Sequence, residues 1–94
     1  MRFIWDEEKS RRNLAKHEVS FETARLVFDD PSAVSRLERV EDGEERWQTL
    51  GLVGGIVILL VVHTYREEGS EEIIRMISAR KATAQERMAY EQGF

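Results

Sequence analysis

The sequence predicts one α+β domain over residues 1–94, with a mostly antiparallel sheet, two N-terminal helices and a C-terminal helix. Three observations predict this class. Helix-capping patterns dominate the chain before Pro31, and alternating or apolar strand patterns follow over about 33–79. A T-x-x-E capping box at Thr83 and Glu86 then opens another helix. The expected order is β-α-α-β-β-β-β-α, on a sheet with one hydrophobic core.

The N-terminal part begins with a short strand candidate, FIW at 3–5. Asp6 is a good N-cap for a helix over about 6–17, which has acids in its first turn and basic residues in its last, as the helix dipole favours. Ser20 is the N-cap candidate of a second helix over about 20–28. An Asp-Asp-Pro sequence ends it, because the residue before proline avoids helical angles.

Strands are expected at 33–40, 46–53, 56–65 and about 71–79. The third of these is apolar on both faces and is therefore expected in the centre of the sheet. Gly54–Gly55 separates the second and third strands and predicts a two-residue hairpin loop. The final helix is expected at about 84–92.

The Gly-Gly loop predicts which residues face each other. If Gly54–Gly55 forms the whole loop, Arg46 opposes His63 at the far end of the hairpin, with both side chains on one face. A guanidinium and an imidazole would then meet at the end of this hairpin.

A four-residue Glu-Glu-Gly-Ser turn would set the next register in the same way. His63 would then neighbour Ile74, with Ser78 and Arg80 on the His63 face and Arg75 on the other face. A turn one residue longer or shorter would exchange the two faces.

Composition excludes several classes of protein. The chain has a net charge of −4, which disfavours non-specific nucleic-acid binding, and it has no cysteine for disulfides or thiolate metal sites. No metal motif or cofactor motif is present. The most apolar run, IVILLVV at 56–62, is far shorter than the roughly 20 residues of a membrane span. The start, MRFIWDEEK, lacks the apolar stretch of a signal peptide, so a cytoplasmic protein is expected.

The first helix collects Lys9, Asn13, Lys16 and His17 on one face. A solvated polar face is the simpler interpretation of that spacing. The chain has two histidines, so a histidine acting in proton transfer near neutral pH must be His17 or His63. For His63 the simpler interpretation is a strand-end side chain held by a hydrogen bond.

Arginines stand beside apolar residues in the predicted strands. Arg46 fits an ordinary surface position, and Arg75 and Arg80 could pair with nearby acids such as Glu86 or Glu72. The alternative is that these guanidinium groups bind an anionic ligand.

Five blocks of the sequence resemble the BrnT family of toxins. They cover nearly the whole chain: WDxxKxxxNxxKHxVSFExA at 5–24, VFDDP at 27–31, DGEERW at 42–47, VVHT at 61–64 and ISARKAT…ER..Y at 77–90. The resemblance implies the toxin of a type II toxin–antitoxin pair, with a fold similar to RelE-type ribonucleases. It also implies metal-independent RNA cleavage that stops translation. A BrnA-type antitoxin with a ribbon-helix-helix-like domain would neutralise the toxin, and DNA would be contacted through that antitoxin alone.

Residue roles follow from the resemblance, position by position. Arg46, Arg75 and Arg80 would hold phosphate, and either His17 or His63 would carry the proton.

On the first helix, Lys9 and Lys16 would bind RNA, and in the second Glu22 is a weaker acid/base candidate. The antitoxin would cover part of the sheet or the C-terminal helix. Two alternatives remain: a catalytically inactive homologue that binds an antitoxin as a regulatory module, and a structural domain whose arginines form only ion pairs.

Overall fold

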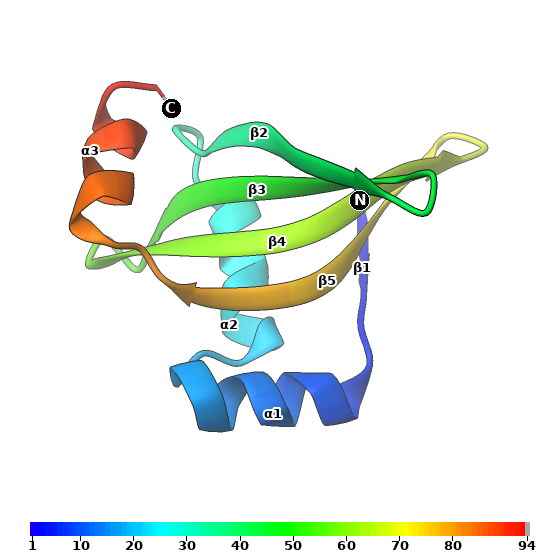
Figure 1. Ribbon diagram of the computed structural model, residues 1–94, viewed down its shortest axis with the longest axis horizontal. Helices are drawn as coiled ribbons and strands as arrows, with labels where there is room; N and C mark the ends of the chain where they lie inside the picture. The colour runs from blue at the N-terminus through cyan, green and yellow to red at the C-terminus, as the bar shows by residue number, and fades with distance from the viewer. Residues whose placement is uncertain (94) are drawn as a thin grey trace.

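The computed structural model describes residues 1–93 and confirms the α+β class and the predicted order of elements (Figure 1). The elements are β1 (Arg2–Ile4), α1 (Glu7–His17), α2 (Phe21–Ala24), the 3₁₀ helix η1 (Arg25–Asp29), β2 (Val34–Glu41), β3 (Glu44–Val53), β4 (Val57–Glu68), β5 (Glu71–Lys81) and α3 (Ala84–Glu91). The predicted second helix is thus α2 continued by η1. Within these residues, no helix is long and apolar enough to cross a membrane.

The sheet has the strand order β1-β5-β4-β3-β2. β1 pairs parallel with β5, and all other neighbours are antiparallel. The apolar strand β4 is therefore central, as its sequence predicts, because a strand buried on both faces has no polar side to turn to water.

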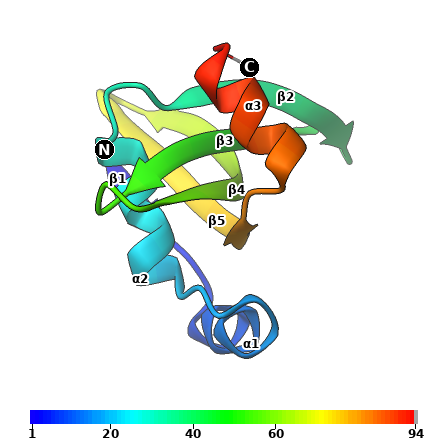
Figure 2. The same ribbon diagram turned by 90° about the vertical axis from the view of Figure 1, so that its left-hand side faces the viewer.

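The two faces of the sheet are covered differently. On the helix-covered face, Phe21, Ala24 and Val27 are completely buried against residues such as Val61 and Met76. The other face, called the open face below, is covered at one end by α3. Figures 1 and 2 show α2 and α3 on opposite sides of the sheet, with α1 below the β5 edge.

The caps predicted from the sequence are present. Asp6 accepts hydrogen bonds from the Glu8 and Lys9 amides, and Ser20 accepts one from the Thr23 amide. Thr83 and Glu86 form the reciprocal capping box of α3. These bonds satisfy amides that would otherwise be unpaired at helix starts, which fixes where each helix begins.

η1 packs very closely on β3, and Gly51 makes this possible. A Cβ atom at position 51 would lie 2.6 Å from Val27 Cγ1 and 2.8 Å from the Val27 carbonyl oxygen. No side chain fits there without moving the backbone of η1.

Asp30, just after η1, ties three elements together. Its Oδ2 accepts hydrogen bonds from the Leu52 amide at 2.7 Å and the Tyr90 hydroxyl at 2.6 Å, and its Oδ1 accepts one from the Ser32 amide at 2.8 Å. Burial alone would raise the pKa of Asp30, but the three hydrogen bonds outweigh it and the pKa is lowered. The carboxylate therefore stays charged and holds α3 against the end of η1.

Asn13 joins α1 to the edge of β5. Its Nδ2 donates to the Val19 carbonyl at 2.7 Å and the Ala79 carbonyl at 2.8 Å, and its Oδ1 accepts from the Ala79 amide at 3.1 Å. Only 7% of Asn13 is exposed. β1 pairs with β5 only as far as Arg75, so the Asn13 amide takes the place of a neighbouring strand further along this edge.

The predicted Arg46–His63 pairing is wrong. The β3–β4 loop has three residues, because Val53 opposes Val57 and Ile56 stands out in solvent with 88% of its surface exposed. Trp47 therefore opposes His63, and Arg46 points to the other face. Since β4 is apolar on both faces, its pattern does not specify the register. One extra loop residue moves every β3 side chain to the other face of the sheet.

The predicted β4–β5 register is also wrong in part. The loop has two residues, so His63 opposes Met76 and not Ile74. A bulge at Ile77 then moves Ser78 and Arg80 to the open face, opposite Val62 and Leu60 and away from His63.

Arg75 was predicted to lie on the face opposite His63, and this is confirmed, because it opposes Thr64. The bulge therefore brings Arg75 and Arg80 to the same side of the sheet, because the turn is shorter by two residues and leaves each side chain on its face.

His63 is a buried histidine with its hydrogen bonds satisfied. Its Nδ1 lies 3.1 Å from the Thr64 carbonyl, which can only accept, so Nε2 is the acceptor of the Thr49 hydroxyl at 2.7 Å. Ser35 Oγ lies 2.6 Å from the Thr49 hydroxyl oxygen, and Phe28 presents its ring to the imidazole at 5.0 Å. Burial lowers the pKa of His63, opposed by the bond to Thr64, so the imidazole is neutral at pH 7.

Replacing Asn13 by alanine should lower the free energy of unfolding by about 2–4 kcal/mol, because buried backbone groups of β5 lose their partner. Urea unfolding followed by circular dichroism measures this. Arg11→Ala, at an exposed position of the same helix, should change the value by less than about 0.5 kcal/mol. Equal effects of the two variants would contradict the role assigned to Asn13.

Stability should fall as the pH drops from about 7.5 to 5.5, because the unfolded chain binds a proton at His63 near its ordinary pKa of 6.5 and the folded chain does not. His63→Gln should flatten this part of the stability curve, because position 63 then binds no proton in either state. Urea unfolding midpoints of the wild type and the variant, measured at both pH values, test this. A curve equally steep in His63→Gln would show that another group is responsible.

Candidate functional site

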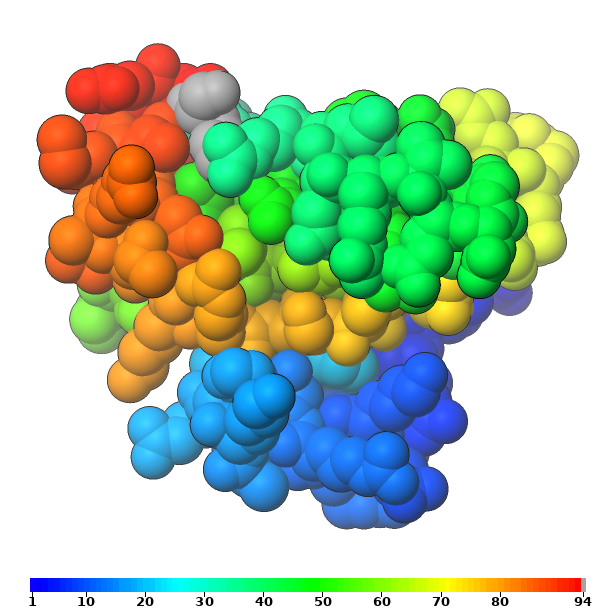
Figure 3. Space-filling model, in the orientation of Figure 1, coloured from blue at the N-terminus to red at the C-terminus, as the bar shows by residue number. Residues whose placement is uncertain are grey.

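Three arginines gather on the open face. Arg46 comes from β3, four residues before Leu50 on the same side, and Arg75 and Arg80 come from β5. Figure 3 looks onto this face, with α3 at its left, the β2–β3 hairpin at its right and α1 below. The antiparallel pairing of β3, β4 and β5 thus brings together residues that lie far apart in the sequence.

Each of these arginines lies within ion-pair distance of a glutamate, although Arg46 Nε makes no hydrogen bond to it. Arg75 donates to Glu44, at the start of β3. Arg46 Nε lies 3.6 Å from Glu41 Oε2, an oxygen that Arg39 also approaches to 2.9 Å. The predicted pairing of Arg75 and Arg80 with acids is therefore confirmed. The partner of Arg75 is Glu44 of the β2–β3 hairpin, however, and not Glu72.

The pair of Arg80 and Glu86 has the best geometry of the three. Arg80 Nη1 and Nη2 donate to Glu86 Oε1 and Oε2 at 2.8 and 3.0 Å. These hydrogen bonds lower the pKa of Glu86, against burial, and raise the pKa of Arg80. Both groups are therefore fully charged at neutral pH.

A second cationic surface, called the α1–β5 groove below, lies between α1 and the edge of β5. One hollow of about 210 Å³ is lined by Lys9, Arg12, Asn13, Lys16, His17, Ile77 and Ser78. A smaller hollow of about 140 Å³ shares Lys9 and includes Arg75. The predicted RNA-binding lysines and His17 therefore lie together, and Lys9 connects their groove to Arg75.

Two of the predicted site residues lie elsewhere. His63 is 4% exposed and lies on the helix-covered face, away from the arginines. Glu22 is exposed in the first turn of α2, which packs on that same face. His63 is thus enclosed in the core, and of the two histidines only His17 shares a surface with the cations.

Some members of the cationic surfaces were not singled out in the sequence. Arg12 lies in the α1–β5 groove, and its spacing from Lys9 and Lys16 could have indicated it. Glu41 and Glu44 could not have been named, because their contacts depend on the hairpin register.

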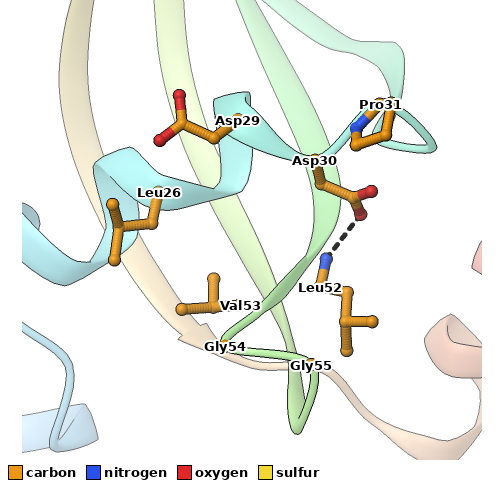
Figure 4. A pocket seen from close by; sticks show the side chains of 8 residues that line it. All are labelled: Leu26, Asp29, Asp30, Pro31, Leu52, Val53, Gly54 and Gly55. Carbon is orange, nitrogen blue, oxygen red and sulfur yellow. Dashed lines mark hydrogen bonds between the residues drawn. The ribbon is translucent and has the colours of Figure 1, made fainter.

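A further hollow of about 350 Å³ lies between η1 and the β3–β4 loop (Figure 4). Asp29 and Asp30 line it, and Figure 4 shows the Asp30 carboxylate turned toward the Leu52 amide. It contains none of the cations. No cluster of three or more metal-ligating side chains occurs among residues 1–93.

Comparison with known proteins shows the family and the fold of the chain. The profile of a family described as "Ribonuclease toxin, BrnT, of type II toxin-antitoxin system" matches residues 5–86. The crystal structure of the Brucella abortus ribonuclease toxin BrnT is similar, with a TM-score of 0.61 and 27% sequence identity. The similarity covers 88% of this chain and 97% of that one. No curated protein sequence matches the chain significantly.

The family match covers most of the chain, including the helix that carries Lys9, Lys16 and His17 and the strands that carry the three arginines. A toxin of a type II system acts together with an antitoxin, so a protein partner is implied. This chain belongs to the BrnT family of ribonuclease toxins of type II toxin–antitoxin systems.

Proposed function

We propose that this chain is a metal-independent endoribonuclease that stops translation by cutting RNA. The observation that supports this best is the gathering of Arg46, Arg75 and Arg80 on one open face beside the cationic α1–β5 groove. An RNA strand crossing from the groove to the open face would meet cations along its backbone. Phosphate contacts of this kind supply most of the affinity for nucleic acids.

The chemistry requires only proton transfer and charge stabilisation. A base takes the proton of the ribose 2′-hydroxyl as its oxygen attacks the adjacent phosphorus. The 5′-oxygen leaves with a proton from an acid, and a 2′,3′-cyclic phosphate remains. Arginines suit the developing negative charge because their planar forks match phosphate oxygens and stay protonated. Arg80 would contact the scissile phosphate. Arg75, which lies further along β5 opposite Thr64, and Arg46 would hold neighbouring phosphates.

The proton carrier would be His17. It lies in the groove beside Lys9 and Lys16, where RNA can reach it, whereas both nitrogens of His63 are already used inside the core. Lys9 and Lys16 would bind the RNA backbone. Glu22 stays a weaker acid/base candidate, because it lies on the other side of the sheet from the arginines.

The partner would be a BrnA-type antitoxin with a ribbon-helix-helix-like domain, and DNA would be bound through that antitoxin alone. Because the open face is covered at one end only, an antitoxin bound over the rest of it would block the arginines directly. Acidic antitoxin residues could replace the glutamates that hold Arg46 and Arg75 in the free chain.

One observation supports the alternative of an inactive, antitoxin-binding homologue. Arg46, Arg75 and Arg80 each already contact a glutamate, and the whole chain carries a net charge of −4. If those ion pairs are not released by RNA, the same surface would serve only the interface with the antitoxin.

Purified protein should cleave a labelled RNA in the presence of EDTA and leave 2′,3′-cyclic ends. Arg80→Ala should slow cleavage by at least about 100-fold, because a preorganised donor on the phosphate is lost. His17→Ala should slow it by about 100-fold or more through loss of proton transfer. Gel analysis of the products measures both effects.

Arg25→Ala is the matched control, since it removes the same charge from the far side of the molecule, where Arg25 lies over Phe3. It should cleave as the wild type does. Cleavage abolished by EDTA would contradict the metal-independent mechanism. No cleavage by the wild type, free or with ribosomes, would favour the antitoxin-binding module.

A further inference from the structure

The guanidinium of Arg80 has unused hydrogen-bonding capacity on one side. An arginine carries five N–H donors. Nη1 donates to Glu86 Oε1 and, at 3.3 Å, to the Lys81 carbonyl, while Nη2 donates to Glu86 Oε2. These bonds use three N–H groups. The Nε–H and the second Nη2–H are left over, and no acceptor within residues 1–93 takes them.

The two remaining N–H groups form one complete fork. They lie parallel on the same edge of the planar guanidinium, which is the arrangement that binds two oxygens of a phosphate. The Arg80 side chain is 39% exposed, whereas that of Glu86 is 17% exposed. Glu86 therefore occupies the inner end of the guanidinium, and solvent reaches the rest of the group.

Glu86 is itself fixed in place. Its Oε1 accepts the Thr83 amide at 2.9 Å, and its own amide donates to the Thr83 hydroxyl at 3.1 Å. The carboxylate is thus part of the first turn of α3 and cannot turn away without breaking the cap. By contrast, Glu44, which holds Arg75, is more exposed, and no side-chain cap of this kind holds it.

Space for a nucleotide adjoins this pair. A hollow of about 440 Å³ lies between β2 and α3 on the open face, and Glu86, Gln85 and Arg36 line it. Because Glu86 both lines this hollow and binds Arg80, the hollow lies beside the Arg80–Glu86 pair.

We propose that Glu86 is a positioning residue for RNA cleavage. It binds the Nη1 and Nη2 end of Arg80. The remaining pair of donors, Nε–H and the second Nη2–H, is thereby already oriented to bind the substrate phosphate. This inference rests on the proposed ribonuclease function and adds a carboxylate to a site otherwise described by its cations. Preorganised donors stabilise a transition state better than mobile ones, because the chain has ordered them in advance.

The opposite role for Glu86 would be a mask that competes with phosphate for Arg80. The two roles predict opposite effects on RNA cleavage when the charge of Glu86 is removed. Removing the charge of a mask would increase RNA binding and cleavage, whereas removing a positioning carboxylate would decrease cleavage.

The test is Glu86→Gln, compared with Glu91→Gln on the same helix. Glutamine also functions in a capping box, so the variant should keep the melting temperature of the wild type within a few degrees. Glu91 is exposed, and its replacement removes the same charge. We expect Glu86→Gln to cleave labelled RNA about 10- to 100-fold more slowly, and Glu91→Gln to cleave at the wild-type rate or slightly faster.

A double variant separates positioning from general destabilisation. Adding Glu86→Gln to Arg80→Ala should slow cleavage no further, because Glu86 acts through Arg80. Unchanged or faster cleavage by Glu86→Gln alone would overturn the inference, as would a full additional loss in the double variant.

A second readout does not require cleavage. The Arg80 Nε–H signal in ¹⁵N-resolved NMR should shift when inorganic phosphate is added to the wild type, and this shift should be lost in Glu86→Gln. If the wild type cleaves no RNA but this signal responds as described, the ribonuclease proposal fails and the positioning of Arg80 stands. If the wild-type signal does not respond to phosphate, or responds equally in Glu86→Gln, the positioning role is overturned.

Discussion

The side-chain amide of Asn13 determines where the two cationic surfaces lie relative to each other. β5 carries Arg75 and Arg80, and its outer edge is paired with β1 only near Arg75. Beyond that point, Asn13 bonds to both polar groups of Ala79 and so fixes α1 along the strand. The helix face with the lysines and His17 is thereby held beside the edge of the arginine-bearing strand. Asn13 lies on the helix face that the sequence predicts to be solvated, yet its side chain attaches the helix to β5.

The sequence predicted the elements well because their signals are local. Asp6, Ser20 and the Thr83–Glu86 capping box mark helix starts through contacts within one turn, and these contacts are present. The register was not predictable in the same way. β4 is apolar on both faces, so its pattern does not show which residues of β3 and β5 share each face with it. The three-residue loop sets this for β3, and the bulge at Ile77 sets it for β5. A bulge of this kind has no residue signature comparable to a cap.

The residue types of the candidate site were predictable, and so was Glu86 as a partner of Arg80, but the partners of Arg75 and His63 were not. The resemblance to the BrnT family indicated the arginines and the first-helix lysines, and the structure places them on two adjoining surfaces. The burial of His63 depends on Thr49 and Phe28, which are distant in sequence. Equally, the contact of Arg75 with Glu44 exists only in the folded sheet. A chain of net negative charge can thus carry cationic groups on one surface, because its glutamates lie beside the arginines and leave part of each guanidinium exposed.

The central claim is that RNA lies across the open face and the α1–β5 groove. Amide chemical-shift mapping with a short 2′-O-methyl RNA, which has no free 2′-hydroxyl and so cannot be cleaved, tests this most directly. The account predicts saturable shifts around Arg46, Arg75 and Arg80 and along the Lys9–His17 face of α1. Shifts confined to the hollow between η1 and the β3–β4 loop, or to α2, would contradict it.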